Sequence, residues 1–212
     1  MLSRSSFPLQ ALAALLLLGA GSVRAEGPSD ADAGYDRSGF HLGIGGVYAF
    51  EELRYDVDSL GVGEAFAGNF DPRFDDSAGI DLYFGYRLHP RLDLVFQYEW
   101  LEGFDSTRGD PALELDTHLL LVNARVFLLT GRWQPYALAG AGALIVNTEI
   151  VNKNFDKPFD VDVGAAFRFG GGVDYYATPN WVVGVEGGYL VPTGPVKPAK
   201  YGSVGVSLRY RF

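Results

Sequence analysis

Three histidines, His41, His89 and His118, are the side chains of this sequence best suited to general acid–base chemistry. His118 follows Asp116 by two residues, so the two side chains lie on one face if this segment is a strand. A Ser–His–carboxylate acylhydrolase also needs a serine beside that pair, and the nearest one, Ser106, stands across an expected loop. His and Asp at such a strand rim are ordinarily solvated surface groups. We therefore expect no enzymatic activity.

An acidic segment, residues 51–77, is the second candidate site. It carries eight acidic residues against Arg54 and Arg73, and divalent cations or a basic partner are the ligands that such a charge would attract. It lacks the regular Asp and Gly spacing of a calcium loop, so we expect a solvated acidic loop and no metal site. The acidic residues are Glu51, Glu52, Asp56, Asp58, Glu64, Asp71, Asp75 and Asp76.

Composition excludes several other classes. The 212 residues include no cysteine, which removes disulfide scaffolds, Cys-ligated metals and thiol catalysis. A net charge of -9 argues against a nucleic-acid partner, because phosphate recognition depends on clustered Lys and Arg. No sequence feature indicates a cofactor: the run Gly170-Gly171-Gly172 lies inside an expected strand and is no phosphate loop. The 28 glycines and 30 aromatic residues (15 Phe, 12 Tyr, 3 Trp) are unusual for a soluble enzyme.

The elements that carry these residues are alternating runs, which predict β-strands. The last run puts Val206, Leu208 and Tyr210 on one face and Ser207 and Arg209 on the other. Eight such runs are expected, at about 39–50, 80–88, 92–100, 115–128, 133–147, 162–176, 181–189 and 201–212. Long segments at 51–77, about 104–114, 148–161 and 191–200 alternate with tight turns at 89–90, 130–132 and 177–180. This is the connectivity of an outer-membrane barrel.

The bulky apolar face points to a lipid environment. A closed barrel leaves no unpaired edge in the bilayer, and a narrow lumen accepts the opposite, small or charged face. Aromatic residues near the run ends predict two interfacial girdles. One girdle holds Phe40, Tyr86, Trp133, Tyr136, Tyr175, Trp181, Tyr210 and Phe212 near the short turns, and the other holds Tyr48, Phe50, Trp100 and Tyr189 near the long loops.

The first 25 residues are expected to be a cleaved signal peptide. Arg4 precedes an apolar stretch at 11–20, and Val23-Arg24-Ala25 supplies a small-residue cleavage site. Residues 26–38 are small, polar and acidic, and are expected to form a flexible periplasmic leader. Residues 39–212 form the expected barrel, which is all-β, eight-stranded, antiparallel and up-and-down.

The parity of the runs also predicts which charges face the lumen. Charges in a narrow lumen are costly unless they are paired, and Arg pairs well with carboxylates. Since the signs balance, we expect a closed ion-pair network rather than an ion-selective pore, with His41 also pointing inward. The ten residues of the expected lumen network are Asp81, Arg87, Asp93, Glu99, Arg125, Arg168, Asp174, Glu186, Arg209 and Arg211.

The stretches WQPYALAGAGALIV, FRFGGGVDYYATPNWVVGVEGGYL and YGSVGVSLRYRF resemble the small outer-membrane β-barrel family of Gram-negative bacteria. That family includes the opacity proteins and the transmembrane domain of outer-membrane protein A. The resemblance implies a location in the bacterial outer membrane, and it implies that Tyr210 and Phe212 form the signal read by the barrel-assembly machinery.

The implied partners are outer-membrane lipids and lipopolysaccharide, the assembly machinery, and a host or surface ligand of the loops. Two function classes remain: a barrel with a filled lumen that acts structurally or through its extracellular loops in surface interaction or adhesion, and a narrow porin-like channel for small solutes or ions. They differ in whether solutes cross a reconstituted membrane.

Overall fold

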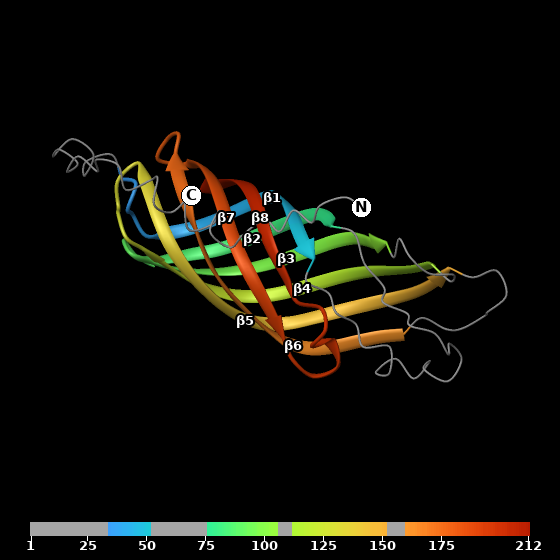
Figure 1. Ribbon diagram of the computed structural model, residues 1–212. Coiled ribbons are helices and arrows are strands. Elements are labelled where there is room, and N and C mark those ends of the chain that lie inside the picture. Colours follow the sequence, from blue (N-terminus) through green and yellow to red (C-terminus); the bar gives the residue numbers. More distant parts are fainter. Residues whose placement is uncertain (1–33, 52–75, 106–111, 152–159) are drawn as a thin grey trace, which may run out of the picture.

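The protein folds into a single closed β-barrel. The structure is a computed structural model, and it describes residues 34–51, 76–105, 112–151 and 160–212. Each strand pairs antiparallel with the next along the chain, and β1 also pairs with β8 (Figure 1). The expected eight-stranded, up-and-down barrel is therefore confirmed. The strands are β1 (Gly39–Glu51), β2 (Ser77–His89), β3 (Leu92–Asp105), β4 (Ala112–Phe127), β5 (Trp133–Val151), β6 (Asp160–Tyr176), β7 (Trp181–Pro192) and β8 (Tyr201–Arg211).

Strand β2 shows how the alternating sequence sets the two faces of the wall. Leu82 and Phe84 are 44% and 51% exposed on the outside of the barrel, whereas Asp81 and Tyr83 are 1% and 4% exposed. Because successive strand residues point to opposite faces, one sequence pattern supplies both an apolar outer surface and a polar interior. No helix in the described part of the chain is long and apolar enough to cross a membrane.

The two ends of the barrel differ. At the short-turn end, residues 90–91, 128–132 and 177–180 connect the strands, while residues 52–76, 106–111, 152–159 and 193–200 connect them at the long-loop end (Figure 1). The Thr178 hydroxyl closes one short turn by accepting the backbone N–H groups of Asn180 and Trp181, at 3.3 and 3.0 Å. The expected alternation of short and long connections is thus correct.

Several strands run further toward the long-loop end than the sequence pattern predicts, and β3 and β5 extend to Asp105 and Val151. β4 and β5 stay in register as far as Ala112 and Val151, and β5 pairs with β6 as far as Thr148 and Asp160. The ladder continues past the regular alternation because each strand still offers its neighbour hydrogen-bonding partners. β7 instead ends at Pro192, which has no backbone N–H to donate, and its pairing with β8 stops at Leu190 and Tyr201.

Apolar side chains fill the lumen toward the long-loop end. A 3-10 helix, η3 (Gly194–Val196), folds against β6 and buries Val196 there. The Thr193 N–H and hydroxyl both donate to the carbonyl oxygen of Ala165, at 2.7 and 3.0 Å, and hold this connection in place. We call this cluster the apolar cap; it consists of Val47, Ala49, Leu101, Leu119, Leu121, Leu144, Val146, Ala166, Leu190, Val196, Ala199 and Tyr201.

Candidate functional site: the charged lumen

Between the apolar cap and the short-turn end, the lumen is lined by polar and charged side chains. All ten residues of the expected lumen network are buried, each at most 5% exposed. They come from β2, β3, β4, β6, β7 and β8, so the closure of the barrel brings together charges that are distant in sequence. The partners of each charge decide what this interior can do.

Three of the five arginines pair with carboxylates. Arg125 donates to Glu186 at 2.7 Å, and Arg168 donates to Glu99 at 2.7 Å. Arg168 also lies 3.7 Å from the second carboxylate oxygen of Glu186, so it links two acidic residues on different strands. The Arg125–Glu186 and Arg168–Glu99 pairs join strands that are not neighbours in the sheet, so they tie opposite walls together across the lumen. The third pair joins Arg209 and Asp174.

The remaining two acids find other partners among the described residues. Asp93 accepts the Nε2–H of His41, whose Nε2 lies 2.9–3.0 Å from the two carboxylate oxygens. Asp81 accepts hydrogen bonds from the Gln97 amide and the Tyr83 hydroxyl, both at 2.9 Å. His41 therefore faces inward as expected, and it and two neutral polar groups, the Gln97 amide and the Tyr83 hydroxyl, serve as partners of these acids in place of arginines.

The other two arginines lie at the short-turn end and bind neutral groups. Arg87 donates to the Gln134 amide oxygen and to the Tyr176 hydroxyl, both at 2.7 Å, and its guanidinium stacks 4.1 Å from the centre of the Phe127 ring. Arg211 donates to the carbonyl oxygen of Tyr35 at 2.6 Å. Neither arginine forms an ion pair with a carboxylate in the described part of the chain, so strict acid–arginine matching does not hold here.

Tyr35 anchors a segment that closes the short-turn end. Its side chain is 7% exposed, and its ring lies 5.6 Å from that of Tyr176. Arg211 also donates to the carbonyl oxygen of Arg37, and Gln134 donates to that of Tyr35 at 3.3 Å. We call Gly34–Ser38 the mouth plug. It belongs to the segment expected to be a flexible leader, of which residues 26–33 lie outside the described residues.

Glycines on the inner face make room for the large charged side chains. A Cβ added at Gly184 would lie 2.7 Å from Arg209 and 3.0 Å from Asp174, and one at Gly188 would lie 2.8 Å from Arg168. The high glycine content thus has a steric cause at these positions, because a larger residue would occupy the space that the ion pairs fill.

The polar partners were the least visible part of the lumen in the sequence. The strand pairing places Gln134 and Tyr176 on the same, inward face as Arg125 and Asp174. Their alternating position in the sequence is therefore the signal from which they could have been predicted. The expected position of Tyr136 in the short-turn girdle is wrong. Tyr136 is 4% exposed, faces the lumen and donates to Glu186 at 2.8 Å, because its even position places it with Gln134 rather than with Trp133.

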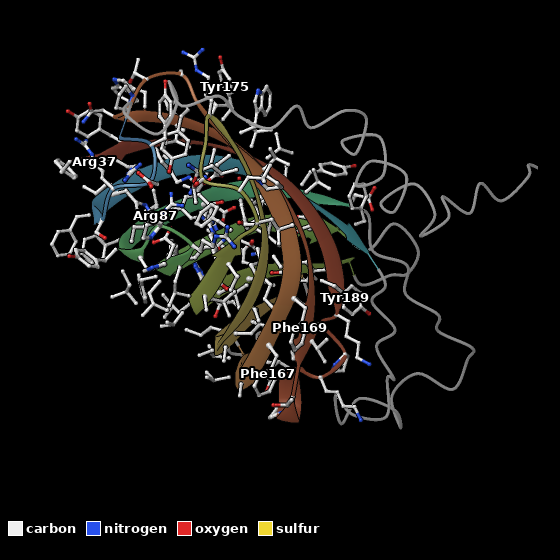
Figure 2. The ribbon with its side chains drawn as sticks, turned by 90° about the vertical axis from the view of Figure 1, so that its left-hand side faces the viewer. Arg37, Arg87, Phe167, Phe169, Tyr175 and Tyr189 are labelled. Carbon is white, nitrogen blue, oxygen red and sulfur yellow. The ribbon has the colours of Figure 1, made fainter. Side chains whose placement is uncertain are left out.

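The other expected girdle residues point outward. Phe40, Trp133, Trp181 and Phe212 are 45–63% exposed near the short-turn end. Figure 2 shows Tyr175 at the same end as Arg37 and Arg87, and Tyr189 toward the opposite end. Tyr210 and Phe212, the expected assembly signal, form an edge-on ring pair with centres 5.2 Å apart. Both rings lie on the outer surface.

The expected acid–base pair, His118 and Asp116, lies outside the lumen. His118 lies on the outer face, where its Nδ1 is 2.8 Å from the Tyr98 hydroxyl, and Asp116 is exposed on the same face. Ser106 lies outside the described residues, as does 52–75 of the acidic segment. His89 is exposed at the end of β2, beside the turn. Within the residues that the structure describes, no group of three or more His, Asp or Glu side chains could hold a metal ion.

Comparison with solved structures shows the same fold in a Neisserial protein and in a protein of Yersinia pestis. Neisserial surface protein A is 15% identical over 82% of this chain and 98% of its own, with a TM-score of 0.56. Ail, the attachment invasion locus protein of Yersinia pestis, in complex with the heparin analogue sucrose octasulfate, is 15% identical over 82% of this chain and 97% of its own, with a TM-score of 0.50. No curated protein sequence matches the chain.

A family model places the chain more firmly than these distant likenesses do. The model for the outer membrane protein beta-barrel domain matches residues 13–212. It agrees with the closed eight-stranded barrel, its apolar outer face and its polar interior. The chain therefore belongs to the outer membrane protein beta-barrel domain family, and its place is the bacterial outer membrane.

Proposed function

We propose that this barrel does not conduct and that it acts structurally or through its long-loop end at the cell surface. The observation that carries the proposal is that the lumen is filled at three successive levels, by the mouth plug, the charged network and the apolar cap. Leu101, Leu144 and Tyr201 in the cap are at most 2% exposed, and so are Glu99 and Arg168 of the network. An eight-stranded barrel leaves little space beyond its own side chains.

Ion pairs make the middle level hard to open. Moving Arg168 aside would separate it from Glu99 and leave two buried charges without their partner, which costs several kcal/mol. A permeating ion would have to break such contacts and then pass the apolar cap, whose side chains are hydrocarbon apart from the Tyr201 hydroxyl and cannot replace its water shell.

The surface role rests on the charge of the acidic segment. Its eight acids against two arginines make a basic protein surface the best match for a ligand. A sulfated ligand like the one bound to Ail would be repelled by this charge. We therefore expect this chain to bind a basic ligand and not a polyanion.

Single-channel recording in planar bilayers tests the filled lumen. We expect no stable openings from the folded barrel, while a general porin in the same bilayers should conduct. Stable openings of sizeable conductance would overturn the proposal and favour the narrow channel. The feature that supports this alternative is a set of buried nitrogen atoms without a partner among the described residues, in His41, Arg125 and Arg209, which internal water could satisfy.

Binding assays with barrels in nanodiscs test the surface role. A basic protein such as lysozyme should bind the unaltered chain and bind much less to a variant in which the acids of 51–77 are replaced by their amides. Equal binding of lysozyme to the unaltered chain and to the amide variant would show that the acidic segment is not the ligand site.

A further inference from the structure

Arg132 is an exposed arginine held on the outer wall of the barrel at the short-turn end. Its Nε donates to the carbonyl oxygen of Tyr176 at 3.2 Å, and the Tyr176 N–H donates back to the Arg132 carbonyl oxygen at 2.9 Å. This reciprocal pair fixes the turn against the end of β6. Among the described residues, Arg132 has no ion pair with a carboxylate, so its charge is uncompensated there.

Two aromatic rings complete a small surface beside this charge. The Arg132 guanidinium carbon lies 5.8 Å from the centre of the Tyr175 ring. Trp133 faces Tyr175 directly across the β5–β6 ladder, with ring centres 4.6 Å apart, and Trp133 is 58% exposed. The Arg132 guanidinium therefore lies beside the Tyr175–Trp133 ring pair, and this pair is on the lipid-facing surface.

The positive charge and the two aromatic rings match the phosphate and the upper acyl chains of a phospholipid at the membrane interface. Trp and Tyr rings prefer the headgroup level, and an arginine at that level keeps its charge in the polar zone. A guanidinium offers two parallel N–H donors to a phosphate, and this geometry favours a phosphodiester over a single point contact. In barrels of this family the short turns face the periplasm, so the lipid comes from the inner leaflet.

We infer that Arg132, Tyr175 and Trp133 form a binding site for the phosphate of an anionic phospholipid in the periplasmic leaflet. An anionic headgroup is favoured over a zwitterionic one because the positive charge of Arg132 has no compensating carboxylate among its described neighbours. A headgroup ammonium would add a second positive charge at the same place.

The barrel contains a matched control for this site. Trp181 and Tyr210 also face each other at the short-turn end, on β7 and β8, with ring centres 5.0 Å apart. Among the described residues no arginine lies over either of these rings. The two Trp–Tyr pairs thus differ in the arginine alone as far as the proposed chemistry is concerned.

Tryptophan quenching by brominated lipids tests the inference in the whole folded barrel. One variant keeps Trp133 as its only tryptophan (Trp100→Phe, Trp181→Phe), and the other keeps Trp181 (Trp100→Phe, Trp133→Phe). Each variant is reconstituted in phosphatidylcholine vesicles that contain a small fraction of phosphatidylglycerol. In one set of vesicles the phosphatidylglycerol is brominated, and in the other set the phosphatidylcholine is. The bromine atoms are on acyl-chain carbons near the glycerol.

We expect the quenching of Trp133 by brominated phosphatidylglycerol to correspond to a local concentration of this lipid about fivefold above its bulk fraction. One arginine near an anionic surface contributes about 1 kcal/mol, which corresponds to a factor of this size. Trp181 should report no such enrichment. Arg132→Gln should abolish the enrichment at Trp133, and Arg91→Gln, a change at another exposed arginine of the same end, should leave it intact.

Three outcomes would overturn the inference. The first is equal enrichment at Trp133 and Trp181, which would be a general property of the girdle. The second is enrichment that survives Arg132→Gln in a barrel whose heat-modifiable gel mobility shows that it is folded. The third is enrichment that disappears when inorganic phosphate replaces chloride at equal ionic strength, because the site would then bind free phosphate rather than lipid.

Discussion

Arg168 on β6 donates to Glu99 on β3 across the lumen at 2.7 Å, although 69 residues separate them in the sequence. The two strands are not neighbours in the sheet, so this ion pair braces opposite sides of the wall. The Tyr201 hydroxyl also donates to Glu99, and Arg168 donates to the Ser203 hydroxyl at 3.0 Å. The pair therefore connects β3, β6 and β8 at the boundary between the charged network and the apolar cap.

Removing one member of this pair should destabilise the barrel strongly. Arg168→Met preserves much of the volume but leaves Glu99 with an uncompensated buried charge, and we expect a loss of about 3–5 kcal/mol in the free energy of unfolding. The double variant Arg168→Met, Glu99→Gln should lose less than the single one. Urea unfolding in lipid vesicles measures both, and a double variant less stable than the single would contradict the bracing role.

Gly184→Ala should destabilise the barrel through the Arg209–Asp174 pair. The added Cβ would lie 2.7 Å from the Arg209 guanidinium and 2.8 Å from the Ser207 hydroxyl, so these side chains must move. We expect a loss of about 1–3 kcal/mol in the free energy of unfolding, as for other overpacked interiors. The matched control is Gly46→Ala, where the Cβ meets no atom within 4 Å. Equal stability of the two variants would argue against steric crowding at Gly184.

The strands and their faces could be predicted from the sequence because a barrel wall imposes a strict period of two. The same parity identified the ten buried charges. It could not assign partners, since Asp93 lies opposite both Arg87 and Arg125 in the ladders yet its carboxylate contacts His41. Partner choice depends on how long side chains cross the lumen, and strand register does not determine that. The sequence pattern does not indicate the mouth plug for a similar reason, because only the closed barrel places the Tyr176 ring beside Tyr35.

Tyr35→Ala should free the mouth plug. Without the buried ring, the backbone at Arg37 loses the packing that presents its carbonyl oxygen to Arg211. We expect trypsin to cleave after Arg37 about tenfold faster, which corresponds to a local loss of about 1.4 kcal/mol. Cleavage after Arg91, in the β2–β3 turn, should proceed at the same rate in both proteins. If the rate after Arg37 does not change, Tyr35 does not hold the segment.

Tyr136→Phe tests the corrected position of this residue in the lumen. The change removes the hydroxyl that donates to Glu186 at 2.8 Å, and hydrogen bonds to charged groups contribute about 1.5–3 kcal/mol. We expect a loss of that size in the free energy of unfolding. Tyr175→Phe, on the outer surface, is the control and should change the stability little. If Tyr136 lay in the girdle instead, Tyr136→Phe and Tyr175→Phe would change the free energy of unfolding equally little.

Phe212→Ala tests the proposed assembly signal. Phe212 is 63% exposed on the outer surface, and its N–H donates to the Phe40 carbonyl oxygen at 3.0 Å, a backbone contact that the substitution leaves in place. The folded barrel should therefore lose little stability, whereas a receptor that reads the terminal aromatic pair with Tyr210 would lose its contact. We expect much less heat-modifiable barrel in the outer-membrane fraction of cells, together with normal refolding of the purified variant into vesicles.

Phe167→Ala is the matched control, because Phe167 is also a lipid-facing phenyl group, 42% exposed, but lies in the interior of β6. It should assemble in cells at the unaltered level. If both variants assemble equally well, the terminal ring carries no assembly signal. If Phe212→Ala also fails to refold in vitro, its defect is one of stability, because refolding in vesicles involves no assembly machinery. Only a defect confined to cells and to Phe212 supports a role in recognition.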